Sequence, residues 1–456
     1  MAKTMLIAGA LFYKFEEITT ARRAAMLTRQ LNPKWTQNQK ASKFGKRRKP
    51  VEKSIFNAGA VKIHPYKDYY GGVWVARHAS KSVDISGATD ATSWPLRTKE
   101  EANEARCDLE LRPHQTEAVK DWRRLDGDGV CVMPTGAGKT ITGVHIAASC
   151  ASKVLILVPS IDLMEQWKQT IEKHTRVKVV KWSNKRGKTG NITIATFQSI
   201  ARLDLVDAWS MGERHGLVIA DECHRVSAVT FGQVMASLPC RKRLGFTATP
   251  DRDDGLGEWV TQTCGPIFHT VKDEDVEGLG YVLKPSVRFV RHGWDDDFNG
   301  LLDRLQNDIQ RNHLIANTAR NRVNEGGSVL ILTKRVKHVE ILTRYLASEL
   351  GEEKVRALHS KVKDRLEIIQ AARDGVCRVL IATTIADEGL DIPRLDTLIC
   401  AMPVSAVERV KQRVGRIRRP CNGKLEPVVY LIDDNDVIVS RCLTKVKKLC
   451  RDSKWI

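Results

Sequence analysis

Short apolar runs alternate with amphipathic stretches from Leu109 to the end of the chain. This alternation predicts parallel strands joined by crossover helices, because strands buried on both faces read as continuous apolar runs. A stretch with Gly278, Gly280 and Pro285 is typical of a linker and separates two series of candidate strands. The first series is Val130–Met133, Val154–Val158, Ile192–Thr196, Leu217–Ala220 and Leu244–Thr247. The second series is Val287–Val290, Val329–Leu332, Val355–Leu358, Val379–Ala382, Leu398–Cys400 and Val428–Ile432. The predicted fold is therefore α/β, with two parallel sheets in tandem.

The first 105 residues follow a different pattern and predict a small α+β domain. Its expected elements are a strand at 4–13, a helix over Glu16–Leu31, and strands at Ile55–Ile63 and Val73–Arg77. At the other end, Ser440–Ile456 predicts a basic amphipathic helix with Trp455 at its tip. We expect this helix to pack on the last domain, and docking of a partner is the alternative. The expected domain ranges are 1–105, 106–275 and 286–456.

The charge of the chain points to a polyanionic partner. It carries 74 lysines and arginines against 54 acidic residues, a formal net charge of +20. Nucleic acid is the first candidate partner and an acidic membrane surface the second. Residues 1–60 hold 13 of the basic residues and three glutamates, about half of the net charge. The run Lys46, Arg47, Arg48 and Lys49 is open to three interpretations, namely a DNA-backbone contact, a solvated loop or a nuclear-import signal.

Two classes of protein are disfavoured by the sequence. No stretch approaches the roughly 18 apolar residues that a membrane helix needs, and Met5–Phe12 is short for a signal core. The eleven cysteines contain no CxxC pair and no zinc-type cluster with histidines. We therefore expect reduced thiols and a cytosolic protein.

A glycine-containing loop follows the first apolar run and opens into the helix-like stretch Ile141–Ala148. Its glycines let the backbone wrap an anion, which the N–H groups at the helix start would face. The lysine would neutralise the anion and the last threonine can bind Mg²⁺, so ATP is the expected ligand. The strict phosphate-loop pattern requires glycine where Met133 stands. The expected ATP-binding residues are Pro134, Thr135, Gly136, Ala137, Gly138, Lys139 and Thr140.

Two adjacent carboxylates follow the apolar strand Leu217–Ala220. Hydrolysis of ATP needs one carboxylate on the metal side and one that orients or deprotonates water. We expect Asp221 to take the metal and Glu222 the water. An exposed acidic turn is the alternative for such a pair alone, and the phosphate loop upstream argues against it.

Four arginines surround a glycine in the segment Gln412–Arg419. Arg416 and Arg419 lie three residues apart, one helical turn, and so could reach the same γ-phosphate. A basic helix face that binds solvent or nucleic acid is the alternative.

The order and spacing of these segments resemble the superfamily 2 helicases and translocases of the DEAH/DExH type. The resemblance runs from about Leu111 to Arg419. The nine matching segments are Leu111–Gln115, Pro134–Thr140, Val158–Ser160, Thr196–Ser199, Asp221–His224, Thr247–Pro250, Val329–Lys334, Ala382–Pro393 and Gln412–Arg419. The resemblance implies two tandem RecA-like domains, ATP and Mg²⁺ as cofactors, and hydrolysis coupled to movement along a nucleic acid.

The resemblance also implies a role for residues that match its motifs. Thr140 and Asp221 would hold Mg²⁺. The implied catalytic residues are Lys139, Asp221, Glu222, Gln412, Arg416 and Arg419. The implied ATP contacts beyond the phosphate loop are Arg112, Gln115, Gly389 and Asp391. Four further residues are implied to contact the nucleic-acid backbone or to couple the two domains, namely Ser160, Thr196, Thr249 and Thr383. The basic run adds Lys46, Arg47 and Arg48 as expected nucleic-acid contacts.

Within the superfamily, the compact size and the basic first domain resemble the phage UvsW-type and the RecG- and XPB-like DNA enzymes. This resemblance implies unwinding or branch migration of forked and Holliday-type DNA in recombination, repair or replication. The expected compartment is a bacterial or phage-infected cytosol. An RNA helicase and a duplex-DNA translocase without strand separation stay open as alternatives. A non-catalytic binding protein is disfavoured because the motor residues are intact. The oligomeric state is left open, and a monomer is compatible with the sequence.

Overall fold

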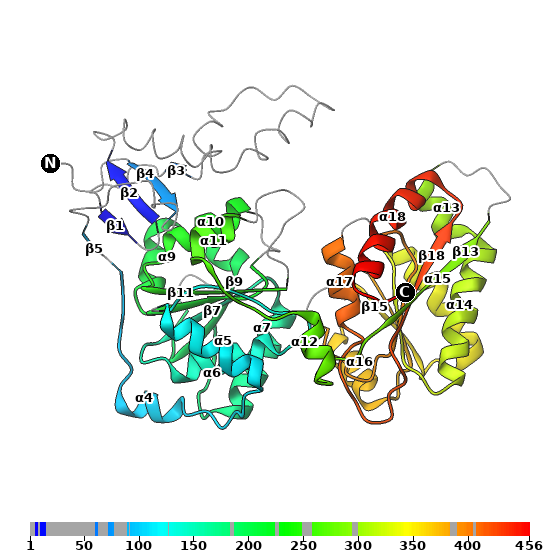
Figure 1. Ribbon diagram of the computed structural model, residues 1–456, viewed down its shortest axis with the longest axis horizontal. Helices are drawn as coiled ribbons and strands as arrows, with labels where there is room; N and C mark the ends of the chain where they lie inside the picture. The colour runs from blue at the N-terminus through cyan, green and yellow to red at the C-terminus, as the bar shows by residue number, and fades with distance from the viewer. Residues whose placement is uncertain are drawn as a thin grey trace, which may run out of the picture. The chain divides into compact units, whose positions relative to one another are not determined.

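The computed structural model of the chain contains two compact units (Figure 1). One is Met1–Met133 with Gly138–Val271, and the other is Lys272–Ile456 with Pro134–Ala137. The structure describes strands at 5–7, 10–14, 60–62, 72–76 and 89–90, and the ranges 92–125, 127–182, 187–223, 228–248, 258–293, 300–383, 390–404 and 407–456. Within these residues, no helix combines the length and apolar character that a membrane crossing requires.

A parallel sheet forms the centre of the first unit. Among the described residues its order is β12-β6-β11-β10-β7-β9-β8. Its strands are β6 (Asp128–Val132), β7 (Val154–Val158), β8 (Val180–Trp182), β9 (Ile192–Thr196), β10 (Leu217–Ala220), β11 (Lys242–Thr247) and β12 (Ile267–Thr270). The helices of this unit are α4 (Lys99–Glu104), α5 (Pro113–Arg124), α6 (Lys139–Ser149), α7 (Ile161–His174), α8 (Phe197–Ala201), α9 (Leu205–Gly212), α10 (Ala228–Ser237) and α11 (Glu258–Cys264).

The central strands of this sheet are those that the apolar pattern predicts best. β7, β9 and β10 have the predicted bounds, and every residue of β7 and β10 is buried. A strand with neighbours on both sides and helices on both faces needs apolar residues throughout. β8 and β12 are not predicted, because both lie at the edges of the sheet and expose part of their residues.

The chain before residue 92 contributes a separate sheet, ordered β3-β4-β2-β1-β5 among the described residues. Its strands are β1 (Met5–Ile7), β2 (Ala10–Lys14), β3 (Ala60–Lys62), β4 (Gly72–Ala76) and β5 (Thr89–Asp90). The prediction of one strand at 4–13 is wrong, since β1 and β2 are antiparallel and Leu6 lies opposite Leu11. The intervening Ala8 and Gly9 give the sequence no polar break to detect. The expected helix Glu16–Leu31 lies outside the described residues.

The second unit contains another parallel sheet, with the order β13-β18-β17-β14-β16-β15 in the described part of the chain. Its strands are β13 (Ser286–His292), β14 (Val329–Leu332), β15 (Val355–Leu358), β16 (Val379–Ala382), β17 (Thr397–Cys400) and β18 (Val428–Asp434). Its helices are α12 (Asp273–Gly278), α13 (Leu301–Asn307), α14 (Ile309–Asn324), α15 (Val336–Leu350), α16 (Arg365–Asp374), α17 (Val407–Gly415) and α18 (Val437–Asp452). Together the two sheets confirm the predicted pair of tandem parallel-sheet domains.

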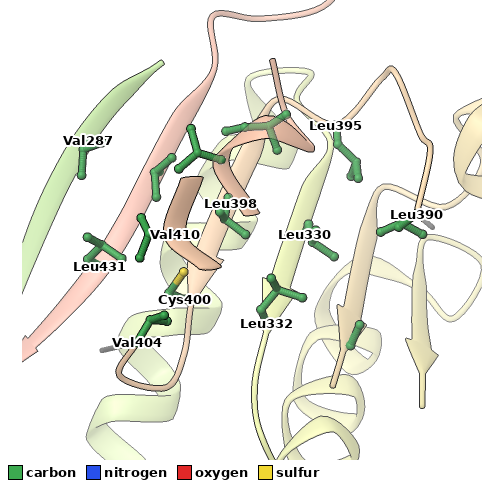
Figure 2. Packing of buried hydrophobic residues seen from close by; sticks show 14 of the residues in the cluster. Val287, Leu330, Leu332, Leu390, Leu395, Leu398, Cys400, Val404, Val410 and Leu431 are labelled. Carbon is green, nitrogen blue, oxygen red and sulfur yellow. The ribbon is translucent and has the colours of Figure 1, made fainter. Parts of the chain in front are cut away.

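The buried side chains of β14, β17 and β18 meet the inner faces of α17 and α18 in one apolar cluster (Figure 2). Leu330, Leu398 and Leu431 belong to it, with Val410 from α17. Trp455 joins the same cluster at 4% exposure, so the expected packing of the C-terminal helix segment is confirmed.

The expected linker is partly helical. α12 occupies its first half and begins with Asp273, Glu274 and Asp275, which favour a helix N-terminus through the helix dipole. Arg418 binds two carboxylates of this helix, Asp273 and Glu277. The glycines that suggested a linker lie at the end of α12 and beyond it.

A strap of residues 92–98 runs along the amino-terminal edge of the first sheet. The main-chain N–H of Arg241, one residue before β11, donates to the oxygen of Ser93 at 3.1 Å. Arg97 donates to the main-chain oxygens of Ala147 and Cys150 at 2.9 and 2.7 Å, which caps the end of α6. The strap is therefore held at the edge opposite to the carboxyl ends of the strands.

Candidate active site

The carboxyl-terminal edge of the first sheet carries both the phosphate loop and the acidic pair. The loop follows β6, and Asp221 and Glu222 follow β10, with β11 between these strands. The main-chain N–H of Met133 donates to the oxygen of Thr247 at 2.9 Å, which ties the start of the loop to the end of β11. Parallel strands end at one edge, so the sheet itself brings these segments together.

Two glycines give the phosphate loop its curvature. Gly136 and Gly138 have φ angles of 92° and 93°, in the left-handed region that side chains with a Cβ rarely adopt. Gly138 is also the N-cap of α6, and a Cβ there would lie 2.2 Å from Nε2 of Gln115. The loop therefore ends in the N-terminus of a long helix, a suitable geometry for a phosphate.

The segment Leu111–Gln115, which carries two of the implied ATP contacts, lies against this loop. Gln115 is 2% exposed, and its Oε1 accepts a hydrogen bond from the main-chain N–H of Arg112 at 2.9 Å. Pro113 starts α5, where a missing N–H costs nothing. The structure thus brings Gln115 to Gly138, and the contact of Arg112 and Gln115 with ATP stays a prediction.

Lys139 and Glu222 form an ion pair. Nζ of Lys139 lies 3.3 Å from Oε1 of Glu222 and donates to the main-chain oxygen of Met133, also at 3.3 Å. Lys139 is 9% exposed, so little water screens the pair. Glu222 has a φ of 48°, an uncommon conformation for a residue other than glycine. The chain therefore adopts a strained turn at the residue expected to orient water.

Asp221 is held by two donors from different parts of the fold. Its Oδ1 accepts from the main-chain N–H of Glu222 at 2.9 Å, and its Oδ2 accepts from Nε1–H of Trp167 at 2.7 Å. The side chain is 2% exposed. Burial, and then the charge of Glu222, raise the pKa of Asp221 to about 6.

The residues at this position fit a divalent cation. Among the described residues Asp221 makes no direct ion pair, and the charge of Lys139 offsets only part of the cost of its burial beside Glu222. Oxygen ligands of this kind suit Mg²⁺, and Thr140 adds a half-buried hydroxyl in the first turn of α6. Thr140 and Asp221 would thus hold the ion, which would neutralise charge on phosphate oxygens.

Two of the expected nucleic-acid contacts are helix caps. Oγ of Ser160 accepts from the main-chain N–H of Leu163 at 3.3 Å and starts α7. Oγ1 of Thr196 accepts from the N–H of Ser199 at 3.1 Å and starts α8. Thr196 is the last residue of β9, and Ser160 lies two residues after the end of β7. Their contact with a nucleic acid stays a prediction.

In the second unit, Arg416 and Arg419 meet the segment that follows β16. Nη1 of Arg416 donates to the main-chain oxygen of Leu390 at 2.9 Å, and Arg419 forms an ion pair with Asp391. The expectation that both arginines lie on one helical turn is wrong, because α17 ends at Gly415. A tight turn follows the helix. The two arginines are instead brought together because they bind neighbouring residues, Leu390 and Asp391.

Two further expected residues, Gln412 and Thr383, belong to the same unit. Gln412 is 7% exposed within α17. Thr383 follows β16 directly, and its N–H donates to the oxygen of Leu358 at 3.2 Å. The residues expected at the site that lie outside the described part of the chain are Lys46, Arg47, Arg48, Thr249 and Gly389.

Two residues of these sites were not expected from the sequence. Trp167 reads as one apolar position in an amphipathic helix, and only the fold shows that its N–H reaches Asp221. Arg418 stands between the two expected arginines, but it is 3% exposed and binds α12. The only sequence signal for this role of Arg418 is the high number of arginines after Gln412, of which one could serve the fold and not the site.

These features define a phosphate-loop nucleotide hydrolase built on two parallel sheets. Residues 108–252 match the family model of the type III restriction enzyme res subunit, and residues 309–421 match that of the helicase conserved C-terminal domain. The chain thus belongs to the superfamily 2 helicases and is an ATP-hydrolysing helicase.

Individual relatives have related names. The chain is 29% identical over 352 residues to "DNA 3'-5' translocase XPB2" of Sulfurisphaera tokodaii, covering 68% of this chain and 79% of that one. It is 27% identical over 358 residues to "DNA 3'-5' helicase XPB" of Kineococcus radiotolerans, where 74% of this chain matches 61% of the relative. The fold resembles that of the DUF1998 helicase MrfA bound to DNA and AMPPNP, with a TM-score of 0.58, 18% identity, and 78% of this chain covering 54% of MrfA.

Proposed function

We propose that this protein is a DExH-type DNA helicase that uses ATP to translocate in the 3'-5' direction and to unwind or branch-migrate forked and Holliday-type DNA. The observation that carries the proposal is the cluster of Lys139, Asp221 and Glu222 at one sheet edge. The names of the relatives, which specify DNA and a 3'-5' direction, support the substrate and polarity. The net charge of +20 supports a polyanionic partner.

The proposal assigns a role to each residue of the cluster. The N–H groups at the start of α6 bind phosphate oxygens, and Lys139 leaves Glu222 to neutralise them. Glu222 then accepts a proton from the attacking water. The proposal further assigns the γ-phosphate contact to Gln412, Arg416 and Arg419.

The finer parts of the proposal rest on resemblance. They are a relationship to the UvsW-type and RecG-like enzymes, a role in recombination, repair or replication, and a bacterial or phage-infected cytosol. Residues 1–105 are proposed as an accessory nucleic-acid-binding domain, 106–275 as the ATP-binding domain and 286–456 as the second RecA-like domain. The contacts proposed for Lys46, Arg47, Arg48, Ser160, Thr196 and Thr383 are with the sugar–phosphate backbone, which makes them independent of sequence.

The test is Mg²⁺-dependent ATP hydrolysis and strand displacement on a matched panel of nucleic acids. The panel contains single-stranded DNA, blunt duplex, a DNA fork, a four-way junction, the same fork in RNA, and partial duplexes with a 3' or a 5' tail. Lys139→Ala should abolish hydrolysis. Lys168→Ala is the matched control, because this lysine pairs with Glu172 on the surface of α7.

The proposal predicts that the DNA fork, the junction and the 3'-tailed duplex are unwound, while the RNA fork is not. Displacement of the RNA fork alone would make the protein an RNA helicase. Hydrolysis stimulated by blunt duplex without displacement would make it a duplex translocase. Faster unwinding of the 5'-tailed duplex would overturn the assigned direction.

A further inference from the structure

Trp167 donates its only polar hydrogen to the carboxylate expected to hold Mg²⁺. The indole is completely buried in α7, and its Nε1 lies 2.7 Å from Oδ2 of Asp221. A bond this short to a buried carboxylate is charge-assisted and stronger than one between neutral groups. The contact spans 54 residues of sequence, so it depends on the fold and not on the local chain.

The two oxygens of Asp221 are fixed by different means. Oδ1 accepts from the main-chain N–H of Glu222 at 2.9 Å, a bond that any residue at position 222 except proline could provide. Oδ2 depends on a side chain, that of Trp167. Each oxygen keeps a second lone pair for a metal ion. Because a carboxylate rotates about its Cβ–Cγ bond, removal of one donor frees its plane to turn.

The indole ring is itself locked in place. A Cβ added to Gly143 of α6 would lie 2.4 Å from Cη2 of Trp167 and 3.1 Å from Cε2 of Phe246. The ring therefore lies directly on the backbone of α6, the helix that starts with Lys139 and Thr140. Trp167 thus connects the helix that holds the phosphate loop to the acidic end of β10.

We propose that Trp167 is a positioning residue that sets the orientation of the Asp221 carboxylate for Mg²⁺. The inference rests on the proposed ATPase function and adds to it a residue for which the sequence resemblance implies no role. Groups that orient a metal ligand typically contribute 10- to 100-fold to metal affinity or activity. A residue that served only as packing would leave the dependence on Mg²⁺ unchanged.

Trp167→Phe tests this, because phenylalanine keeps an aromatic ring and lacks the N–H. Binding of a fluorescent ADP analogue is measured against Mg²⁺ concentration at pH 8, beside the ATPase rate. The concentration for half-maximal binding should rise roughly tenfold. Trp122→Phe is the matched control, since this indole is also buried and its Nε1 has no partner among the described residues. Its Mg²⁺ dependence should equal that of the wild type.

A second variant guards against a folding defect in Trp167→Phe. Benzothienylalanine incorporated at position 167 keeps both rings and replaces the N–H by sulfur. It should reproduce the tenfold shift with an unchanged melting temperature. An Mg²⁺ dependence equal to that of the wild type in this variant would overturn the inference and leave the ATPase function standing. Failure of the wild-type protein to bind the nucleotide would instead overturn the proposed function.

Discussion

Nζ of Lys139 lies 3.3 Å from Oε1 of Glu222, so the cation assigned to phosphate and the carboxylate assigned to water are paired with each other. An incoming phosphate must compete with Glu222 for this lysine. In the proposed mechanism, the pair links ATP binding to the release of Glu222.

Glu222→Gln should therefore bind ATP more tightly and hydrolyse it more slowly. The neutral amide competes less for Lys139 and repels phosphate less, so the Kd for ATP should fall about fivefold, or roughly 1 kcal/mol. The hydrolysis rate should fall at least 100-fold, as expected for loss of a general base. Fluorescent-nucleotide binding and single-turnover hydrolysis measure the two effects. Glu165→Gln, which removes a half-exposed partner of Lys181, should change neither.

Gly143→Ala tests the packing of the indole on α6. Alanine in a helix normally adds about 1 kcal/mol of stability over glycine. Here the new Cβ would lie 2.4 Å from Cη2 of Trp167, so the variant should be destabilised by about 1–3 kcal/mol. In a Trp167→Phe background the colliding atom is gone, and most of this loss should disappear. Calorimetric melting of the wild type, the two single variants and the double variant gives the coupling free energy between positions 143 and 167. Losses of stability that simply add in the double variant would contradict the contact.

Arg311 and Asp434 form a completely buried bidentate pair in the second unit, with distances of 2.8 and 3.0 Å. Arg311→Met should cost about 3–5 kcal/mol, because it leaves a buried carboxylate uncompensated. Replacing both residues, with Asp434→Leu, should cost less than the single change. Arg320→Met on the same helix removes an exposed pair with Glu349 and should cost under about 1 kcal/mol. Melting by calorimetry compares these variants.

The second unit should lose stability in mild acid because of His338. Its Nε2–H donates to Oδ1 of Asn312 at 2.9 Å, and its Nδ1 accepts from Oγ1 of Thr333 at 2.8 Å, which fixes the neutral form. Burial lowers the pKa of His338 to about 3. The unfolded chain binds the proton near pH 6.5, so this contribution is complete above that pH and is lost as the pH falls toward 3.

The expected loss from this residue is about 2 kcal/mol between pH 7 and pH 5. Calorimetric melting across this range measures it. His338→Gln should show a shallower pH dependence than the wild type, while His313→Gln, at an exposed position of α14, should keep the wild-type slope. Equal slopes in all three proteins would show that His338 titrates normally in the folded state.

The sequence predicts best those strands that are buried along their whole length. β7 and β10 are buried along their whole length, and their apolar runs give the correct bounds. The exposed edge strand β12 mixes polar and apolar residues and gives no such signal. α12 was missed because Gly278 at its end and Gly280 beyond it resemble a linker. The acidic residues at its N-terminus and its ion pair with Arg418 stabilise the helix, and neither is visible in the periodicity of apolar residues.

In the site, too, some residues are predictable from the local sequence and others only from the fold. Phosphate-loop glycines and adjacent carboxylates carry their chemistry in the local sequence. The structure adds a contact that the sequence did not predict, the ion pair of Lys139 with Glu222. Trp167 acts over a long sequence separation, and nothing in α7 distinguishes it from other apolar positions. The turn that carries Arg416 and Arg419 was predicted as helix, since the sequence does not show that α17 stops at Gly415.

The strap of residues 92–98 has a consequence for how this protein can diversify. The chain joins the first sheet at its amino-terminal edge, where Arg97 donates hydrogen bonds to main-chain oxygens at the C-terminal end of α6. Lys139, Asp221 and Glu222 lie at the other end of the same strands and helix. A domain attached ahead of residue 92 therefore enters the first unit at the edge away from the three residues assigned to catalysis. We expect changes in that domain to alter the preference for one nucleic-acid structure more than the rate of ATP hydrolysis.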